Sequence, residues 1–170
     1  MDLLHVIGPI CSETVDSFFP DFTECDNRKS KAPIVIRICS PGGESSSGLA
    51  IYDLIKTARH EVAIEAYGEC SSVAMVILQA AKIRIAAPSC RALIHNGVLE
   101  VSDGRLVGAQ LKAAVKELKR LDEFFHRLMA ERTGLPFKEI QRLCCNETVL
   151  TAQEMLKMNF VDAILGQEKE

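Results

Sequence analysis

Three segments of the chain carry residue types that can do chemistry: a serine, a pair of glycines and a histidine, each beside a short apolar run. Ser72 follows the run that starts at Tyr67 and opens an apolar stretch of helical character. At the first turn of a helix, a serine hydroxyl lies near unpaired N–H groups and the positive end of the helix dipole, where an alkoxide or oxyanion is stabilised. Serine is also a common helix N-cap, so a chemical role for Ser72 depends on its partners.

The glycine pair lies in Ser40–Gly43, a Ser-Pro-Gly-Gly turn between an apolar run and a predicted helix. Proline fixes the entry to a turn, and two glycines let the backbone approach another group closely. An ordinary strand-to-helix turn is the simpler interpretation of this tetrapeptide. The functional interpretation is that a glycine N–H faces a substrate carbonyl oxygen.

The histidine is His95, which ends the apolar run from Arg91 and precedes Asn96-Gly97. A side chain at such a point leaves a sheet for a cleft, where a histidine can take the proton of a serine nucleophile. The remaining histidines are interpreted as structural residues of strands or helices: His5, His60 and His126.

Composition limits the classes of function. The 170 residues suit one compact domain, 1–170, and no apolar run is long enough to cross a membrane. A net charge of −3 without a basic stripe gives no support for nucleic-acid binding. The seven scattered cysteines lack zinc spacing, and the pair Cys144-Cys145 is interpreted as core-packed thiols. The scattered cysteines indicate a reducing compartment, so we expect a cytoplasmic protein, and the N-terminus lacks the basic region and long apolar stretch of a signal peptide. We expect no metal or cofactor.

Short apolar runs alternate with longer helical patterns, which predicts an α/β fold with a largely parallel sheet. We expect strands at Leu3–Ile7, Ile34–Cys39, Val62–Tyr67, Ile83–Ala86 and Leu93–His95, with a last one at Phe160–Leu165. We expect helices at Glu13–Phe19, Ser47–Ala58 and Ser72–Ala81, and a surface loop at Thr23–Ala32. A capping box, Thr151–Glu154, predicts a further helix that runs to Met158.

A long amphipathic helix is predicted between Gly108 and Gly134, because apolar residues recur there at three- and four-residue spacing. A helix of this length either projects and packs against a neighbouring subunit or lies across its own sheet. The sequence favours neither interpretation.

Together these segments resemble the ClpP family of serine peptidases, which have a crotonase-like fold. The motifs that carry the resemblance are Ser40–Gly43, Gly68–Ser72, Arg91–His95, Glu147–Glu154 and Val161–Ile164, in the family's order. The resemblance extends from Leu3 to Leu165. It implies repeated β-β-α and β-α units, a mainly parallel sheet and a long protruding handle helix.

The resemblance also implies the site. Ser72 would be the nucleophile and His95 the general base, with the N–H groups of Gly43 and Val73 as the oxyanion hole. Ser71 is the rival nucleophile, but it aligns with a non-catalytic position of the family. After the histidine, the family has a Gln-Pro…Gly-Gly segment where this chain has Asn96–Val101. We expect Val98–Val101 to serve as an extended edge strand, so that a substrate peptide lies along Gly42 and Val98, Leu99 and Glu100.

The third member of the triad departs from the family, which has aspartate where this chain has Glu147. Glutamate keeps the carboxylate, whereas Asn146 would orient the ring without charge, and Asp162 is a third choice. The family's ionic positions around this residue are Cys145, Asn146 and Thr148 here, so ring stacking through ionic contacts is not expected. The family's axial segment does not precede Leu3, so an AAA+ unfoldase partner is not assumed.

The resulting hypothesis is a serine endopeptidase that cleaves polypeptides through an acyl-enzyme in a homo-oligomeric ring. One alternative is a catalytically silent structural subunit of the same fold. Another is a crotonase-like enzyme that acts on an acyl thioester, although such enzymes do not use a Ser/His pair.

Overall fold

Five parallel strands form the main sheet of the computed structural model, which describes residues 2–29, 32–99 and 107–167. Their order across the sheet is β1 (Asp2–Ile7), β2 (Ile34–Ser40), β3 (Val62–Cys70), β4 (Ile83–Ala86) and β7 (Ala163–Ile164). A second ladder starts at the end of β3, where β5 (Arg91–Ile94) pairs in parallel with β3 and antiparallel with β6 (Thr148–Thr151). The predicted α/β class with a mainly parallel sheet is therefore confirmed.

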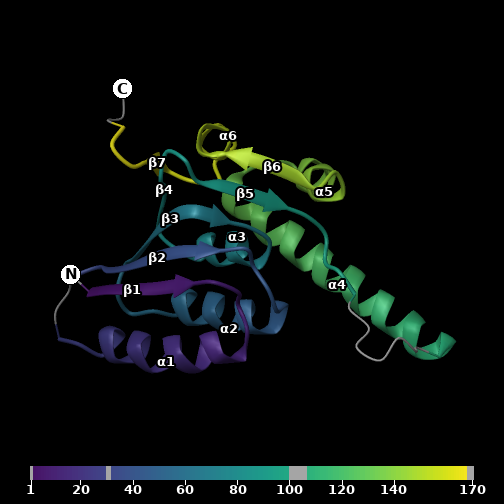
Figure 1. Ribbon diagram of the computed structural model, residues 1–170, viewed down its shortest axis with the longest axis horizontal. Helices are drawn as coiled ribbons and strands as arrows, with labels where there is room; N and C mark the ends of the chain where they lie inside the picture. Colours follow the sequence, from purple (N-terminus) through teal and green to yellow (C-terminus); the bar gives the residue numbers. More distant parts are fainter. Residues whose placement is uncertain (1, 30–31, 100–106, 168–170) are drawn as a thin grey trace.

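Six helices complete this part of the chain: α1 (Ser12–Asp26), α2 (Ser45–Lys56), α3 (Val73–Leu78), α4 (Gly108–Thr133), α5 (Phe137–Cys145) and α6 (Ala152–Lys157). Helices α1 and α2 lie side by side below β1–β3 (Figure 1). All six residues of α3 are buried. A Cβ atom on Gly48 of α2 would lie 2.1 Å from Val73 Cγ2, so α2 packs directly on the start of α3.

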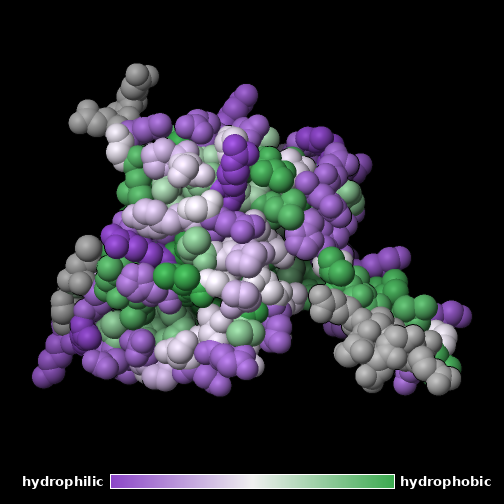
Figure 2. Space-filling view, viewed as in Figure 1, coloured by the Kyte–Doolittle hydropathy of each residue, from purple (hydrophilic) through white to green (hydrophobic). Residues whose placement is uncertain are grey.

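The long helix α4 projects from the body of the molecule and does not lie across its own sheet, while its packing against a neighbouring subunit stays a prediction (Figure 1). Its buried side chains all belong to its C-terminal part: His126, Leu128, Met129 and Thr133. Its N-terminal part exposes apolar side chains such as Leu111 and Val115, and Figure 2 shows apolar surface along this helix. Among the described residues, no helix has the length and apolar character needed to cross a membrane.

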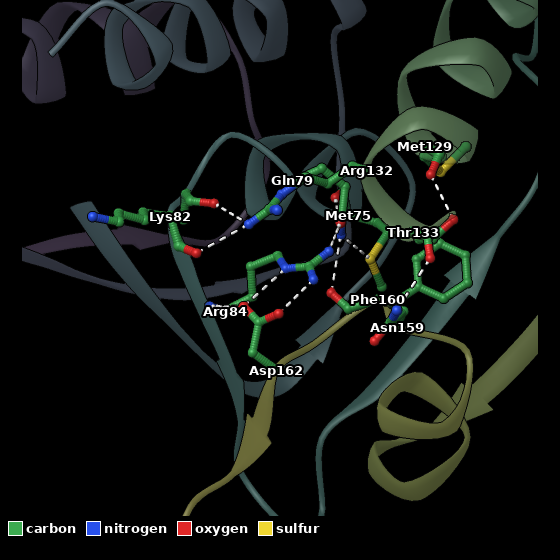
Figure 3. Close-up of polar contacts among 11 residues, drawn as sticks. Met75, Gln79, Lys82, Arg84, Met129, Arg132, Thr133, Asn159, Phe160 and Asp162 are labelled. Carbon is green, nitrogen blue, oxygen red and sulfur yellow. Dashed lines mark hydrogen bonds and ion pairs between the residues drawn. The ribbon is translucent and has the colours of Figure 1, made fainter. Parts of the chain in front are cut away.

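The C-terminal strand β7 is attached to the core by a buried polar network (Figure 3). The Arg84 side chain, 3% exposed, donates to both carboxylate oxygens of Asp162, over 3.1 Å from Nε and 2.6 Å from Nη2. Its Nη1 donates to Gln79 Oε1 over 2.6 Å, and Gln79 Nε2 donates to the Phe160 carbonyl over 3.2 Å. The network links β4, α3 and the segment before β7.

Several expected boundaries were wrong. Helix α1 continues through Pro20 to Asp26, so Thr23–Asp26 is helical rather than loop. Phe22 and Cys25 extend the buried face that Phe18 begins, and this packing outweighs the hydrogen bond lost at proline.

The last strand is shorter than expected, and α5 and β6 had not been expected. Helix α3 is likewise shorter than the expected Ser72–Ala81. Cys144 is buried as expected, but Cys145 is exposed, because neighbouring residues of a helix point in different directions.

Candidate active site

Ser72 occupies the tight turn between β3 and α3. Its backbone has φ 55° and ψ −129°, a conformation that costs a residue with a side chain on the order of 1–3 kcal/mol. Two backbone hydrogen bonds hold the turn, from Ser71 N–H to the Ser40 carbonyl over 3.0 Å and from Ser72 N–H to the Leu93 carbonyl over 2.8 Å. The ends of β2 and β5 thus impose the strained conformation on Ser72.

The two serines of this turn have different environments. Ser71 is 2% exposed, and its hydroxyl donates to Glu69 Oε1 over 2.8 Å and accepts from Leu93 N–H over 2.9 Å. Within the described ranges, no hydrogen bond involves the Ser72 hydroxyl. Ser71 therefore ties β5 to the turn, whereas the hydroxyl of Ser72 is free to react.

The glycine turn packs against Ser72. A Cβ atom on Gly42 would lie 2.6 Å from Ser72 Cβ and 3.1 Å from its Oγ, so only glycine fits beside this serine. A Cβ atom on Gly43 would lie 2.1 Å from the Ile10 carbonyl oxygen. In the part of the chain that the structure describes, no hydrogen bond occupies the N–H of Gly43 or of Val73, so both remain available as donors.

His95 follows β5 and lines the same small hollow as Ser72, which has a volume of about 40 Å³. Its Nδ1 lies 2.6 Å from the Asn96 carbonyl oxygen, which can only accept, so Nδ1 carries the proton. The tautomer leaves a lone pair on Nε2, the form that a general base needs. Among the described residues, no hydrogen bond joins His95 to Ser72; catalytic hydrogen bonds are often absent until substrate binds.

Glu147 lies in the turn before β6, with φ 49° and an exposed side chain. The β5–β6 register pairs Ile94 with Thr148, so the next position outward sets Glu147 opposite His95. The carboxylate nevertheless does not line the hollow that Ser72 and His95 share. The register therefore sets the backbone of the expected third residue opposite the histidine, and among the described residues no hydrogen bond or ion pair joins its side chain to His95.

The other expected residues are distributed as follows. Asp162 is held by Arg84 in the network of Figure 3, and Asn146 caps α5. Val98 and Leu99 follow the histidine segment and are 71% and 36% exposed, and Glu100 and Val101 lie outside the described residues.

Two residues of α4 enter the site without having been predicted to do so. Asp122 and His126 line the hollow together with Ser72 and His95. Asp122 Oδ1 accepts from Gly97 N–H over 2.7 Å, and His126 Nε2 lies 3.1 Å from Asn96 Oδ1. Burial lowers the pKa of His126, so its ring is neutral near pH 7 and donates to this amide oxygen. Their four-residue spacing on one helix face was the available sequence signal.

The remaining walls of the hollow are mostly apolar, and they come from α3, β5 and α4: Val73, Val76, Ile94, Phe125 and Met129. Among the described residues, no group of three His, Cys, Asp or Glu side chains could hold a metal ion. The arrangement offers a hydroxyl, a neutral imidazole and two free N–H groups, which are the parts that acyl transfer requires.

Comparison with known proteins gives a consistent result. A family model described as Clp protease matches residues 3–168. The chain is 29% identical over 147 residues to ATP-dependent Clp protease proteolytic subunit 3 of Synechococcus sp. (strain CC9605), covering 85% of this chain and 72% of that protein. It is 29% identical over 147 residues to subunit 2 of Prochlorococcus marinus (strain MIT 9312), covering 85% and 71%. It is also 25% identical over 158 residues to subunit 1 of Tropheryma whipplei (strain Twist), covering 92% and 76%.

Proposed function

This chain belongs to the Clp protease family, and from that premise we propose that it is a serine endopeptidase with Ser72 as nucleophile and His95 as general base. The observation that carries the proposal is the shared hollow, which is lined both by a strained serine with an unbonded hydroxyl and by a histidine protonated on Nδ1. Neither residue alone would distinguish a peptidase from a structural turn.

In the proposed reaction, Ser72 Oγ attacks the peptide carbonyl carbon while His95 Nε2 takes the hydroxyl proton. The free N–H groups of Gly43 and Val73 stabilise the oxyanion that forms. His95 then gives its proton to the leaving amine, and the acyl chain remains on Ser72 as an ester. A water molecule, deprotonated by His95, hydrolyses this ester and restores the serine.

We further propose that the substrate chain lies along Gly42 and the exposed Val98–Leu99 segment, with Glu100 next along the chain. Glu147 is the proposed third member of the triad, since the strand register sets it opposite His95. The Asn96 carbonyl holds His95 Nδ1 in this structure, so the carboxylate would have to replace that hydrogen bond. The expected cytoplasmic location stays a prediction.

Membership in this family implies an oligomer with peptide substrates and a Clp ATPase partner. We propose a homo-oligomeric ring, and the exposed apolar side chains of the projecting α4 support contact between subunits (Figure 2). A catalytically silent subunit is the second candidate, and the position of the Glu147 side chain outside the hollow favours it.

The test is intact-mass analysis after treatment with a fluorophosphonate, which forms a phosphonyl ester with an activated serine. We expect one adduct on the native protein, none on Ser72→Ala, and one on the matched control Ser71→Ala. An assembled native protein without adduct would refute the peptidase and support the silent subunit. Turnover of an acyl thioester by Ser72→Ala would instead support a crotonase-like activity.

A further inference from the structure

The segment His95–Gly97 is attached to α4 at two consecutive residues. Asp122 accepts from Gly97 N–H, and His126 contacts the side chain of Asn96, whose carbonyl accepts from His95 Nδ1. A Cβ atom on Gly97 would lie 2.5 Å from Leu118 Cδ1, so this backbone lies directly on α4. The orientation of the histidine therefore depends on a helix far from it in sequence.

Asp122 differs from the other acidic groups near His95. Asp122 is one of the residues that line the hollow containing Ser72 and His95, whereas Glu147 is not. A carboxylate beside an imidazole stabilises the imidazolium that forms when serine gives up its proton. Asp122 thus brings a carboxylate to the hollow that contains His95, although its hydrogen bond goes to the Gly97 backbone, and among the described residues none joins it to the ring.

Resting on the proposed function, we propose that Asp122 is a positioning residue for His95, which holds the Gly97 backbone in place and supplies negative charge to the hollow. The side chain acts through the histidine segment and does not need to touch substrate. The proposal adds a residue of the long helix α4 to the site. Asp122 would support His95 where Glu147, which does not line the hollow, does not.

Other titratable and charged groups lie around this segment. They are His126, Lys119 and Glu123 on α4, Cys145 on α5 and Glu147 in the turn before β6. Glu123 provides a matched control, because it neighbours Asp122 in sequence but is 54% exposed and paired with Arg127. Glu147→Gln, tested in the same assay, measures how much the expected triad residue contributes to the reaction rate of Ser72.

The experiment measures the rate at which a fluorophosphonate phosphonylates Ser72 as a function of pH in the assembled protein. Asp122→Ala removes the acceptor and the charge, and we expect a loss of about 10-fold or more, within the usual contribution of general-base catalysis. Asp122→Asn keeps an acceptor for Gly97 N–H, so its loss should be smaller.

The pH profile separates positioning of the base from a merely structural role. Removing a negative charge disfavours the protonated imidazole, so the midpoint of the rising acid limb moves to lower pH in Asp122→Asn. Glu123→Gln should keep the native rate and midpoint. A native midpoint in Asp122→Asn would overturn the proposal, provided that circular dichroism shows native fold. If the fluorophosphonate does not modify Ser72 in the native protein, the proposed peptidase itself is refuted.

Discussion

Replacing Asp162 with asparagine tests the network that attaches β7 to the core. The Asp162 carboxylate accepts three hydrogen bonds from Arg84, from the backbone N–H over 2.8 Å and from Nε and Nη2 of the guanidinium. An asparagine offers one oxygen, and its NH₂ group faces the guanidinium donors. The variant therefore leaves a buried cation without its counter-charge.

The expected loss follows from the burial of the two partners. Removing one partner of a buried ion pair costs about 3–5 kcal/mol. The Arg84 side chain is 3% exposed, but that of Asp162 is 33% exposed, so water recovers part of the loss. We expect the free energy of unfolding to fall by about 3 kcal/mol, at the low end of that range. For a chain of this size, this corresponds to roughly 6–12 °C in Tm.

The stabilisation that the Asp162–Arg84 pair provides changes with pH in a definite direction. Burial alone would raise the pKa of Asp162, but hydrogen bonds from the Arg84 side chain and backbone N–H outweigh it and lower the pKa. The stabilisation is therefore fully present above the unfolded pKa of about 3.9 and is lost as the pH falls through the lower folded pKa. The difference between native protein and Asp162→Asn should be constant from about pH 5 to 8 and shrink below about pH 4.

The assay is urea unfolding followed by circular dichroism, at pH 7 and at pH 4 and below. The matched control is Glu139→Gln, which breaks an exposed pair with Arg142 and should cost less than about 0.5 kcal/mol. A loss below about 1 kcal/mol for Asp162→Asn, or one equal to that of the control, would refute the assignment of a strong buried pair.

Two further predictions concern packing around the site and the thiols. Gly48→Ala puts a Cβ atom 2.1 Å from Val73 Cγ2. We therefore expect the free energy of unfolding, measured with urea, to fall by about 1–3 kcal/mol, and Ser72 to react more slowly with a fluorophosphonate. Native reactivity together with native stability would contradict the tight contact. A thiol reagent at pH 8 should modify exposed Cys145 in the folded protein but not Cys144, whose pKa burial raises to about 12. Peptide mapping after modification distinguishes the two neighbours, and equal labelling would argue against the burial of Cys144.

Much of the fold follows from local pattern. The strands β1–β4 are nearly continuous apolar runs, and α4 ends at Gly134, which adopts φ 77° as a helix C-cap. The capping box is present as expected, with Glu154 N–H donating to Thr151 Oγ1 over 3.3 Å and Thr151 N–H donating to Glu154 Oε2 over 2.8 Å. Short-range hydrogen bonds and periodicity are properties of neighbouring residues, so the sequence contains them directly.

What the sequence does not reveal depends on contacts between distant residues. Helix α5 contributes only three buried side chains, and its existence depends on packing against α4 and β6. The bond between Asp122 and Gly97 joins residues 25 positions apart and has no signature in either segment. Ser72 and His95 were identified by motif, but the lining of their hollow required the path of α4.

The backbone of Ser72 has an evolutionary consequence. At φ 55° and ψ −129°, glycine would occupy this position without the strain that serine bears. Exchange for glycine would release about 1–3 kcal/mol and remove the proposed nucleophile in the same mutation. Backbone strain thus favours loss of the proposed nucleophile over its retention. In a descendant lineage that used the protein for assembly alone, glycine is an expected replacement at this position.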